Sequence, residues 1–142
     1  MANMKEWILS EPVIDCINHN QICTTQADIL FINAYTVTKK ELDFASVYNI
    51  KAKRDDYLHG FVVWFDAIFD SIHIPITLST SPFYPATHWK QAIFMLDEAL
   101  PVCKGDLITG SIASKKCAEN PRHLDVKISV DLKGKAIKAT AE

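Results

Sequence analysis

The chain has 142 residues, of which 49% are hydrophobic and 23% are charged, and its formal net charge is −2 at pH 7. These values are ordinary for one globular domain with a hydrophobic core, and a slightly acidic balance gives no electrostatic case for nucleic-acid binding. No apolar run approaches the roughly 20 residues that cross a bilayer. Residues 1–10 include Lys5 and Glu6 and lack the apolar stretch of a signal peptide, so no membrane association is expected.

Residues 1–9 predict a short helix, with Met4, Trp7 and Ile8 on one side, that ends before Pro12. Beyond Pro12 the segments are rich in β-branched and aromatic residues, or alternate apolar with polar residues, which is typical of strands. The candidate strands are 13–17, 28–37, 41–53, 57–70, 72–78, 92–96, 107–113, 123–132 and 135–141. Antiparallel strands joined by short loops close into a barrel or pack as a sandwich.

Two of these segments support more specific predictions. The segment 57–70 is almost continuously apolar, which predicts a central strand that is buried on both faces and bent at Gly60. The segment 123–132 alternates strictly between apolar and polar residues. Lys133 and Gly134 follow it and predict a tight turn into an antiparallel return strand.

The positions of the cysteines and glycines argue against two kinds of site, a Cys-x-x-Cys pair and a glycine-rich nucleotide-binding loop. Cys16, Cys23, Cys103 and Cys117 are far apart and form no Cys-x-x-Cys pair, so we expect reduced thiols buried as small hydrophobic groups. None of the four glycines occurs at the spacing of a phosphate-binding or dinucleotide-binding loop. We therefore expect no nucleotide or adenosyl-cofactor site on this chain.

The stretch 79–91 is the most informative feature of the sequence. Thr87, His88 and Trp89 follow a turn in which Pro82 and Pro85 fix two φ angles, and an apolar strand comes next. In one interpretation the indole caps one end of the fold and the imidazole bonds a backbone carbonyl. In the other, the imidazole positions a substrate at the rim of the fold.

Two further patterns contain residue types that occur at functional sites. Cys16, His19 and Cys23 have a spacing that could suit a metal, but a closed zinc site needs four ligands and no second pair is evident, so no metal is expected. The hydroxyl run Ser79–Thr80–Ser81 before Pro82 could be phosphorylated, but the pattern favours a plain turn.

Several segments resemble the C-terminal β-barrel domain of protein arginine N-methyltransferases, most closely the type I members. They occur in the family's order from about residue 11 to residue 135. They are 28–43 around Tyr-Thr-Val, Lys-Ala-Lys-Arg-Asp-Asp-Tyr-Leu-His-Gly from Lys51, Leu-Ser-Thr-Ser-Pro from Leu78, Thr-His-Trp-Lys-Gln from Thr87, and Asn-Pro-Arg-His-Leu-Asp-Val from Asn120. Together these segments are far more specific than any one motif.

The resemblance implies a mainly β fold, an antiparallel β-barrel with a short N-terminal helix. Residues 1–12 would be a remnant of the family's dimerisation arm, and residues 13–142 would form the substrate and dimerisation barrel. The family's Rossmann-like cofactor domain, its double-glutamate loop and the start of the barrel are expected to be missing. The sequence would then be a fragment of a longer enzyme, itself inactive.

The resemblance also implies a function for the parent protein, which would transfer methyl groups from S-adenosylmethionine to arginine guanidinium nitrogens of proteins. Histones and Gly/Arg-rich proteins are the expected substrates, in cytoplasm and nucleus, and the parent is expected to be a homodimer. His88 would position the substrate, with Thr87 and Trp89 beside it. No cofactor is expected to bind this chain by itself.

Two other functions remain open from the sequence. The chain could be a stand-alone β-barrel that holds an apolar ligand, with Trp64 and Phe65 lining the cavity. It could also be a protein-interaction module. A large interior cavity would favour the ligand-binding alternative, and a packed interior would count against it.

Overall fold

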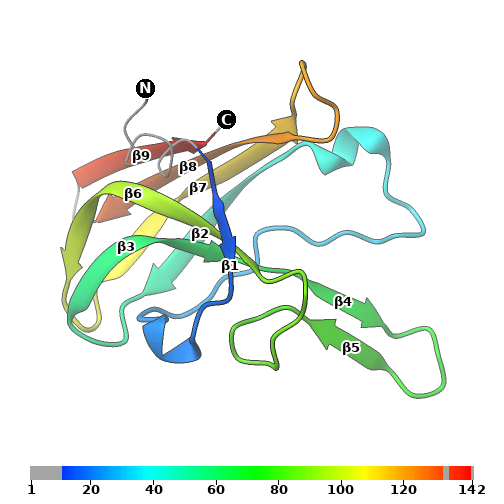
Figure 1. Cartoon of the computed structure of the whole chain (residues 1–142), viewed down its shortest axis with the longest axis horizontal. Helices are drawn as coiled ribbons and strands as arrows, with labels where there is room; N and C mark the ends of the chain where they lie inside the picture. Colours follow the sequence, from blue (N-terminus) through cyan, green and yellow to red (C-terminus); the bar gives the residue numbers. More distant parts are fainter. Residues whose placement is uncertain (1–10, 133–134, 142) are drawn as a thin grey trace.

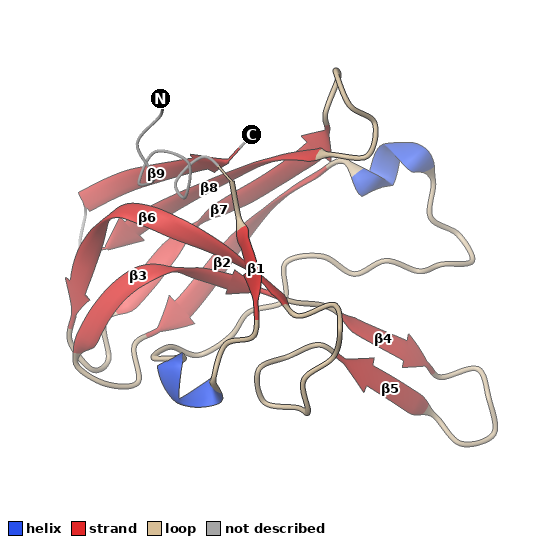
Figure 2. Ribbon diagram, viewed as in Figure 1, coloured by secondary structure: helices blue, strands red, loops and turns tan. Residues whose placement is uncertain are grey.

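The computed structural model describes residues 11–132 and 135–141, and most of these residues form antiparallel strands (Figures 1 and 2). The elements are β1 (Val13–Asp15), η1 (His19–Gln21), η2 (Lys39–Leu42), β2 (Phe44–Lys51), β3 (Asp56–Val63), β4 (Asp66–Phe69), β5 (Ile76–Ser79), β6 (Gln91–Val102), β7 (Leu107–Lys116), β8 (Leu124–Leu132) and β9 (Lys135–Ala141). No described helix is long and apolar enough to span a membrane. The predicted helix at 1–9 lies outside the described residues.

Two antiparallel sheets face each other across the core, as Figure 1 shows. One sheet has the strand order β1-β6-β3 and the other has the order β2-β7-β8-β9. The strands β4 and β5 form a separate two-stranded hairpin that projects from the body of the molecule. The predicted return of 135–141 along 123–132 is confirmed, because β9 pairs antiparallel with β8 from Leu132 opposite Lys135.

The core lies between the two sheets and consists of alternate residues of the facing strands. Its buried hydrophobic side chains are Cys23, Tyr48, Ala52, Leu58, Phe94, Leu96, Val102, Ile108, Ile112, Ile128, Val130 and Leu132. Tyr48 is the one core tyrosine among the described residues, and its hydroxyl donates to the Ser129 carbonyl oxygen at 2.7 Å. Gly110 permits this approach, since a Cβ there would meet both the Ser129 carbonyl oxygen and the Tyr48 hydroxyl.

The prediction of a closed barrel is wrong for the described residues. The strands β6 and β9 approach each other, but no ladder of hydrogen bonds joins the two large sheets there. Next to the end of β2, Ala52 forms an isolated bridge with Thr24, which belongs to neither sheet. β1 has only three residues, which is too short to extend the first sheet along the second.

The prediction of one buried central strand at 57–70 is also wrong. The chain leaves the first sheet after Val63 and enters the hairpin at Asp66, because the Phe65 backbone pairs with Thr80 instead of continuing along β6. The predicted bend at Gly60 coincides with a shift of register between Leu58 and Gly60. A Cβ at Gly60 would meet the Phe94 carbonyl oxygen, so a glycine is needed for this close pairing.

The segment 28–37 is a loop and not the predicted strand. Asn33 explains the difference, because its carbonyl oxygen accepts from the backbone N–H groups of Thr36 and Val37 at 3.1 and 2.9 Å. The Asn33 side chain also accepts from the Tyr35 N–H at 3.0 Å. These bonds replace a strand ladder with a turn, and Phe31 and Tyr35 are left 83% and 87% exposed.

Candidate functional site

The candidate site is the loop of residues 80–90, which joins β5 to β6. Gln91 fixes this loop from inside the protein and is only 4% exposed. Its side-chain carbonyl oxygen accepts from the Ile17 N–H at 2.8 Å, and its side-chain amide donates to the Thr80 carbonyl oxygen at 2.7 Å. Gln91, where the loop ends, is therefore bonded both to Thr80, where the loop begins, and to Ile17 in the segment that follows β1.

The hydroxyl groups before Pro82 are structural. Ser79, Thr80 and Ser81 are buried. The Thr80 hydroxyl accepts from the Phe65 N–H at 3.0 Å, and the Ser79 hydroxyl donates to an Asp66 carboxylate oxygen at 2.5 Å. The Ser81 hydroxyl accepts from the Phe83 N–H at 3.2 Å. These contacts support the turn interpretation over phosphorylation, because a kinase needs an accessible hydroxyl.

A tight turn presents His88 and Trp89 to solvent. The Lys90 N–H donates to the Thr87 carbonyl oxygen at 3.2 Å, and Lys90 has a φ of 56°, in the left-handed region. The Lys90 ammonium lies 3.9 Å from an Asp15 carboxylate oxygen on β1. Such a backbone conformation in a residue other than glycine is sparsely populated and is often found at functional sites.

The aromatic side chains of the loop form a short stack. The ring centroids of His88 and Trp89 are 4.0 Å apart, and the Phe65 ring meets Trp89 edge-on at 5.9 Å. Trp89 remains 48% exposed. The His88 imidazole makes no hydrogen bond to any described residue, so the interpretation in which it bonds a backbone carbonyl finds no support. Of the sequence-predicted residues, His88 and Trp89 are therefore exposed side by side.

Thr87 is the inward member of the site. Its hydroxyl oxygen is buried and has no hydrogen-bond partner among the described residues. A buried hydroxyl without a partner costs free energy, so this position is less favourable for stability than an apolar residue of the same shape. The Thr87 hydroxyl is thus buried, while His88 and Trp89 are exposed.

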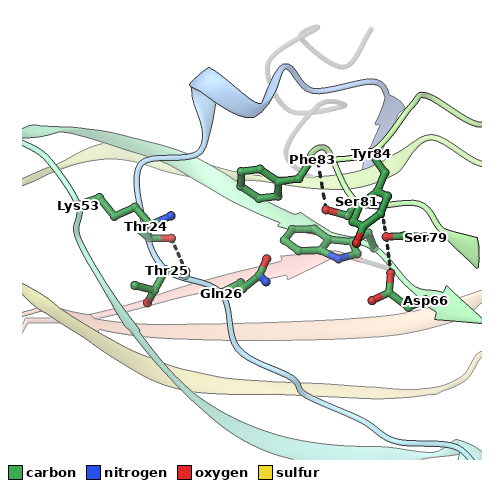
Figure 3. Close-up of a pocket in the computed structure, with 10 residues that line it drawn as sticks. Thr24, Thr25, Gln26, Lys53, Asp66, Ser79, Ser81, Phe83 and Tyr84 are labelled. Carbon is green, nitrogen blue, oxygen red and sulfur yellow. Dashed lines mark hydrogen bonds between the residues drawn. The ribbon is translucent and has the colours of Figure 1, made fainter. Parts of the chain in front are cut away.

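Figure 3 shows a separate cleft of about 480 Å³. His88 and Trp89 are not among the residues that line it, which are Thr24, Thr25, Gln26, Lys53, Trp64, Asp66, Ser79, Ser81, Phe83 and Tyr84. Trp64 and Asp66 face this cleft, whereas Phe65 between them faces Trp89. The ligand-module alternative required Trp64 and Phe65 to line one interior cavity, and they face opposite sides.

The cysteines do not form a common site. Cys23 is buried, while Cys16 and Cys103 are exposed, so the expectation that all four thiols are buried is wrong. Burial raises the pKa of the Cys23 thiol, and the nearby Asp56 carboxylate raises this pKa further. Within 11–132 and 135–141, no group of three histidine, cysteine or acidic side chains is placed to hold a metal.

The fold and the loop together define a mainly β, antiparallel domain that presents a Thr-His-Trp turn on its surface. Residues 1–135 match the family model of the arginine methyltransferase oligomerization subdomain. The chain therefore belongs to this family, and the resemblance drawn from the sequence is confirmed.

Curated relatives agree with this membership. The chain is 36% identical over 141 residues to protein arginine N-methyltransferase 1 of Dictyostelium discoideum, covering 99% of this chain and 41% of that protein. It is 39% identical over 126 residues to protein arginine N-methyltransferase 1 of Schizosaccharomyces pombe, covering 89% of this chain and 37% of that protein. The chain thus spans about two fifths of the length of the curated relatives that it matches.

Solved structures share the fold. The Trypanosoma brucei PRMT1 enzyme–prozyme heterotetrameric complex with AdoHcy superposes with a TM-score of 0.89 at 28% identity, covering 96% of this chain and 45% of that chain. Protein arginine methyltransferase 10 of Arabidopsis thaliana, in an open conformation, superposes with a TM-score of 0.90 at 20% identity and supports the fold alone.

Proposed function

We propose that this chain is the substrate-side domain of a protein arginine N-methyltransferase, which transfers methyl groups from S-adenosylmethionine to guanidinium nitrogens of protein arginines. The observation that carries this proposal is the exposed imidazole of His88, which bonds no described residue and stacks on Trp89 in a loop that Gln91 fixes. A loop that is held at both ends and presents an imidazole to solvent is suited to a second partner. The family membership supports the same role.

The chain itself does not fit the cofactor. Gly60 and Gly110 lie in strands, each against a backbone carbonyl oxygen, and Gly105 lies in a turn before β7. A nucleoside cofactor needs glycines where a loop meets a helix N-terminus, and the described residues offer no such turn. We therefore assign S-adenosylmethionine, which supplies the methyl group, to the part of the parent protein that precedes this chain.

In this proposal His88 acts at the junction with that cofactor-binding part. Its free ring nitrogens would bond an acidic side chain there and help to shape the guanidinium pocket. Two carboxylates of the cofactor-binding part would hold the planar guanidinium by paired hydrogen bonds, which orient a cation well. Trp89 would pack at the same junction, which accounts for its half-exposed indole.

The remaining expectations are part of the same proposal. Residues 1–12 would end a dimerisation arm, and 13–142 would form the substrate domain. The two sheets would close into a barrel only with strands from the preceding part of the parent. Histones and Gly/Arg-rich proteins would be the substrates, in cytoplasm and nucleus, and the parent would be a homodimer.

Steady-state methylation of a Gly/Arg-rich peptide tests this proposal on the chain extended upstream to the length of its relatives. Replacing His88 by alanine should lower kcat/KM by at least about tenfold, since a positioning interaction is lost. His88→Gln should recover part of the activity if hydrogen bonding from the ring matters. His59→Ala is the matched control, because His59 is exposed on β3 and lies outside the loop. Unchanged kinetics in His88→Ala would refute the assigned role.

A further inference from the structure

The turn of residues 87–90, which carries His88 and Trp89, has two features that are unfavourable by themselves. Lys90 has a φ of 56°, and the Thr87 hydroxyl oxygen is buried without a partner among the described residues. Such features persist only where the surrounding structure holds them in place. Contacts from outside the turn are therefore needed to keep His88 and Trp89 where they lie.

Phe65, in the connection between β3 and β4, supplies one of these contacts. Its ring meets Trp89 edge-on, with the centroids 5.9 Å apart and the planes at 79°, an arrangement that aromatic pairs prefer. Trp89 in turn lies 4.0 Å from the His88 ring, with the planes at 32°. Phe65 and His88 make no ring contact with each other, so an effect of Phe65 on His88 passes through Trp89.

The backbone of Phe65 is fixed by Thr80, where the His88 loop begins. The Phe65 N–H donates to the Thr80 hydroxyl at 3.0 Å. The Phe65 carbonyl oxygen accepts from the Thr80 N–H at 3.0 Å and from the Thr80 hydroxyl at 2.8 Å. Thr80 itself is 1% exposed, and its carbonyl oxygen accepts from the side-chain amide of Gln91, where the loop ends. Phe65 is therefore held in place relative to both ends of this loop.

Core packing does not account for the phenylalanine at position 65. Phe65 is not one of the buried core residues, and 47% of it is exposed. Its ring nevertheless lies against the one residue of the loop that stacks on the His88 imidazole, among the residues that the structure describes. The contact with Trp89 is thus the feature that distinguishes this side chain.

We propose that Phe65 is a positioning residue for His88: its ring holds Trp89 and thereby keeps the imidazole stacked on the indole. Phe65 acts through Trp89 and not on the substrate. A side chain that is already ordered loses less conformational freedom when its partner binds. The kinetic consequence of this inference rests on the proposed function, whereas the arrangement of the three rings does not.

Proton NMR of the His88 ring in the 142-residue chain tests the arrangement directly. The indole shifts the imidazole protons upfield while the two rings are stacked, and the signals lost in His88→Gln identify them. Phe65→Leu keeps an apolar side chain but removes the aromatic edge, so the His88 signals should move toward the positions of a free imidazole. Phe65→Tyr keeps the ring and should keep the shifts of the unsubstituted chain.

Phe69→Leu is the matched control for this measurement. Phe69 is 56% exposed on β4 and makes no ring contact with a described residue, so its replacement should leave the His88 signals unchanged. Unchanged His88 signals in Phe65→Leu would overturn the inference. Equal changes in Phe65→Leu and Phe69→Leu would overturn it too, because they would show a general loosening of the hairpin.

Methylation kinetics on the chain extended upstream test the consequence. Phe65→Leu should lower kcat/KM for a Gly/Arg-rich peptide by about three- to tenfold, the range expected when one aromatic pair is lost, and Phe65→Tyr should recover most of it. In a Trp89→Ala background Phe65→Leu should cause no further loss, because the contact is already absent. Additive losses would show that Phe65 contacts the substrate or the rest of the parent protein directly, and would overturn the inference.

Failure of this inference can be distinguished from failure of the proposed function. If His88→Ala leaves methylation unchanged, the proposed role of His88 fails, and the NMR measurement still decides whether Phe65 holds the imidazole. If His88→Ala lowers kcat/KM but Phe65→Leu does not, the positioning role of Phe65 is overturned and the proposed function stands.

Discussion

At the scale of single residues, Gln91 connects three parts of the chain through one side chain. It accepts from the Ile17 N–H and donates to the Thr80 carbonyl oxygen while being almost completely buried. The glutamine amide offers both an acceptor and a donor without charge. Sequence reasoning missed this role, although a glutamine at the start of an apolar strand is a signal of a buried polar contact.

Replacing Gln91 by leucine should lower the free energy of unfolding by about 2 kcal/mol, because the partly buried Ile17 N–H and the buried Thr80 carbonyl oxygen lose their partners. Urea denaturation followed by far-UV circular dichroism measures this change. Gln26→Leu is the control, since Gln26 is exposed, and it should stay within about 0.5 kcal/mol. Equal loss in the two variants would show that the hydrogen bonds of Gln91 do not stabilise the fold.

Tyr48 is a second residue with a measurable consequence. Burial raises the pKa of its phenol well above the ordinary value near 10, while the hydroxyl donates to Ser129 inside the core. Above pH 10 the unfolded chain loses the phenol proton and the folded chain keeps it. The folded state therefore binds more protons, and its stability falls as the pH rises through this window.

The unfolding free energy of the unsubstituted chain should fall more steeply above pH 10 than that of Tyr48→Phe. The difference in slope approaches about 1.4 kcal/mol per pH unit, because one phenol is involved. Urea titrations at pH 9, 10 and 11 would measure it. Tyr57→Phe serves as control, since Tyr57 is largely exposed, and it should keep the slope of the unsubstituted chain. Parallel slopes for Tyr48→Phe and the unsubstituted chain would contradict the prediction.

At the scale of elements, the pairing of β7 with β8 depends on a close approach at Gly110. The Ser129 carbonyl oxygen belongs to the backbone of β8 and cannot rotate away from an added Cβ. Gly110→Ala should therefore destabilise the chain by about 2–3 kcal/mol, the usual cost of overpacking a core. Thermal unfolding would report this loss, and Asn49→Ala on the exposed side of β2 should leave the midpoint unchanged. A tolerated Gly110→Ala would mean that β7 and β8 separate more easily than their register suggests.

At the scale of the whole molecule, we proposed that this chain is the substrate-side domain and that another part of the parent protein binds the cofactor. Calorimetry tests this division. S-adenosylmethionine titrated into this chain should release no heat of binding, whereas the chain extended upstream to the length of its relatives should bind. Gly60 and Gly110 each face a backbone carbonyl oxygen, and Gly105 lies in the turn before β7, so the prediction rests on the absence of a glycine-rich loop at a helix N-terminus among the described residues. Binding to the 142-residue chain alone would overturn the assignment of the cofactor to the preceding part.

Much of this arrangement could be predicted from the sequence, and the failures have physical causes. The strict alternation of 123–132 predicted β8 and its return strand, because one face of that strand is buried and the other is solvated. The apolar run 57–70 wrongly predicted one buried strand. Apolar residues that are exposed in this domain look the same in sequence as apolar residues that are buried in its core. Asn33 broke the strand predicted at 28–37 through local hydrogen bonds that composition does not reveal.

The candidate site, too, could be predicted only in part from the sequence. His88, Trp89 and Thr87 could be found because they are consecutive and follow two prolines. Their support could not be found, because Phe65 and Ile17 reach the loop only through the fold. Whether the described strands close into a barrel also depends on pairing between strands that are distant in sequence, which no local pattern encodes.

Because the Ile17 N–H is bonded to the Gln91 side chain, the exchange rate of this backbone proton reports on how often the end of the His88 loop opens. The Ile17 N–H lies outside any strand, yet it is bonded to a side chain 74 residues away in sequence. Its exchange with deuterium is therefore governed by the opening of the loop and not by the fraying of a strand end. The Ile17 resonance in a nitrogen–proton correlation spectrum would then show whether the bond to Gln91 at the end of the His88 loop is formed, without any substrate present.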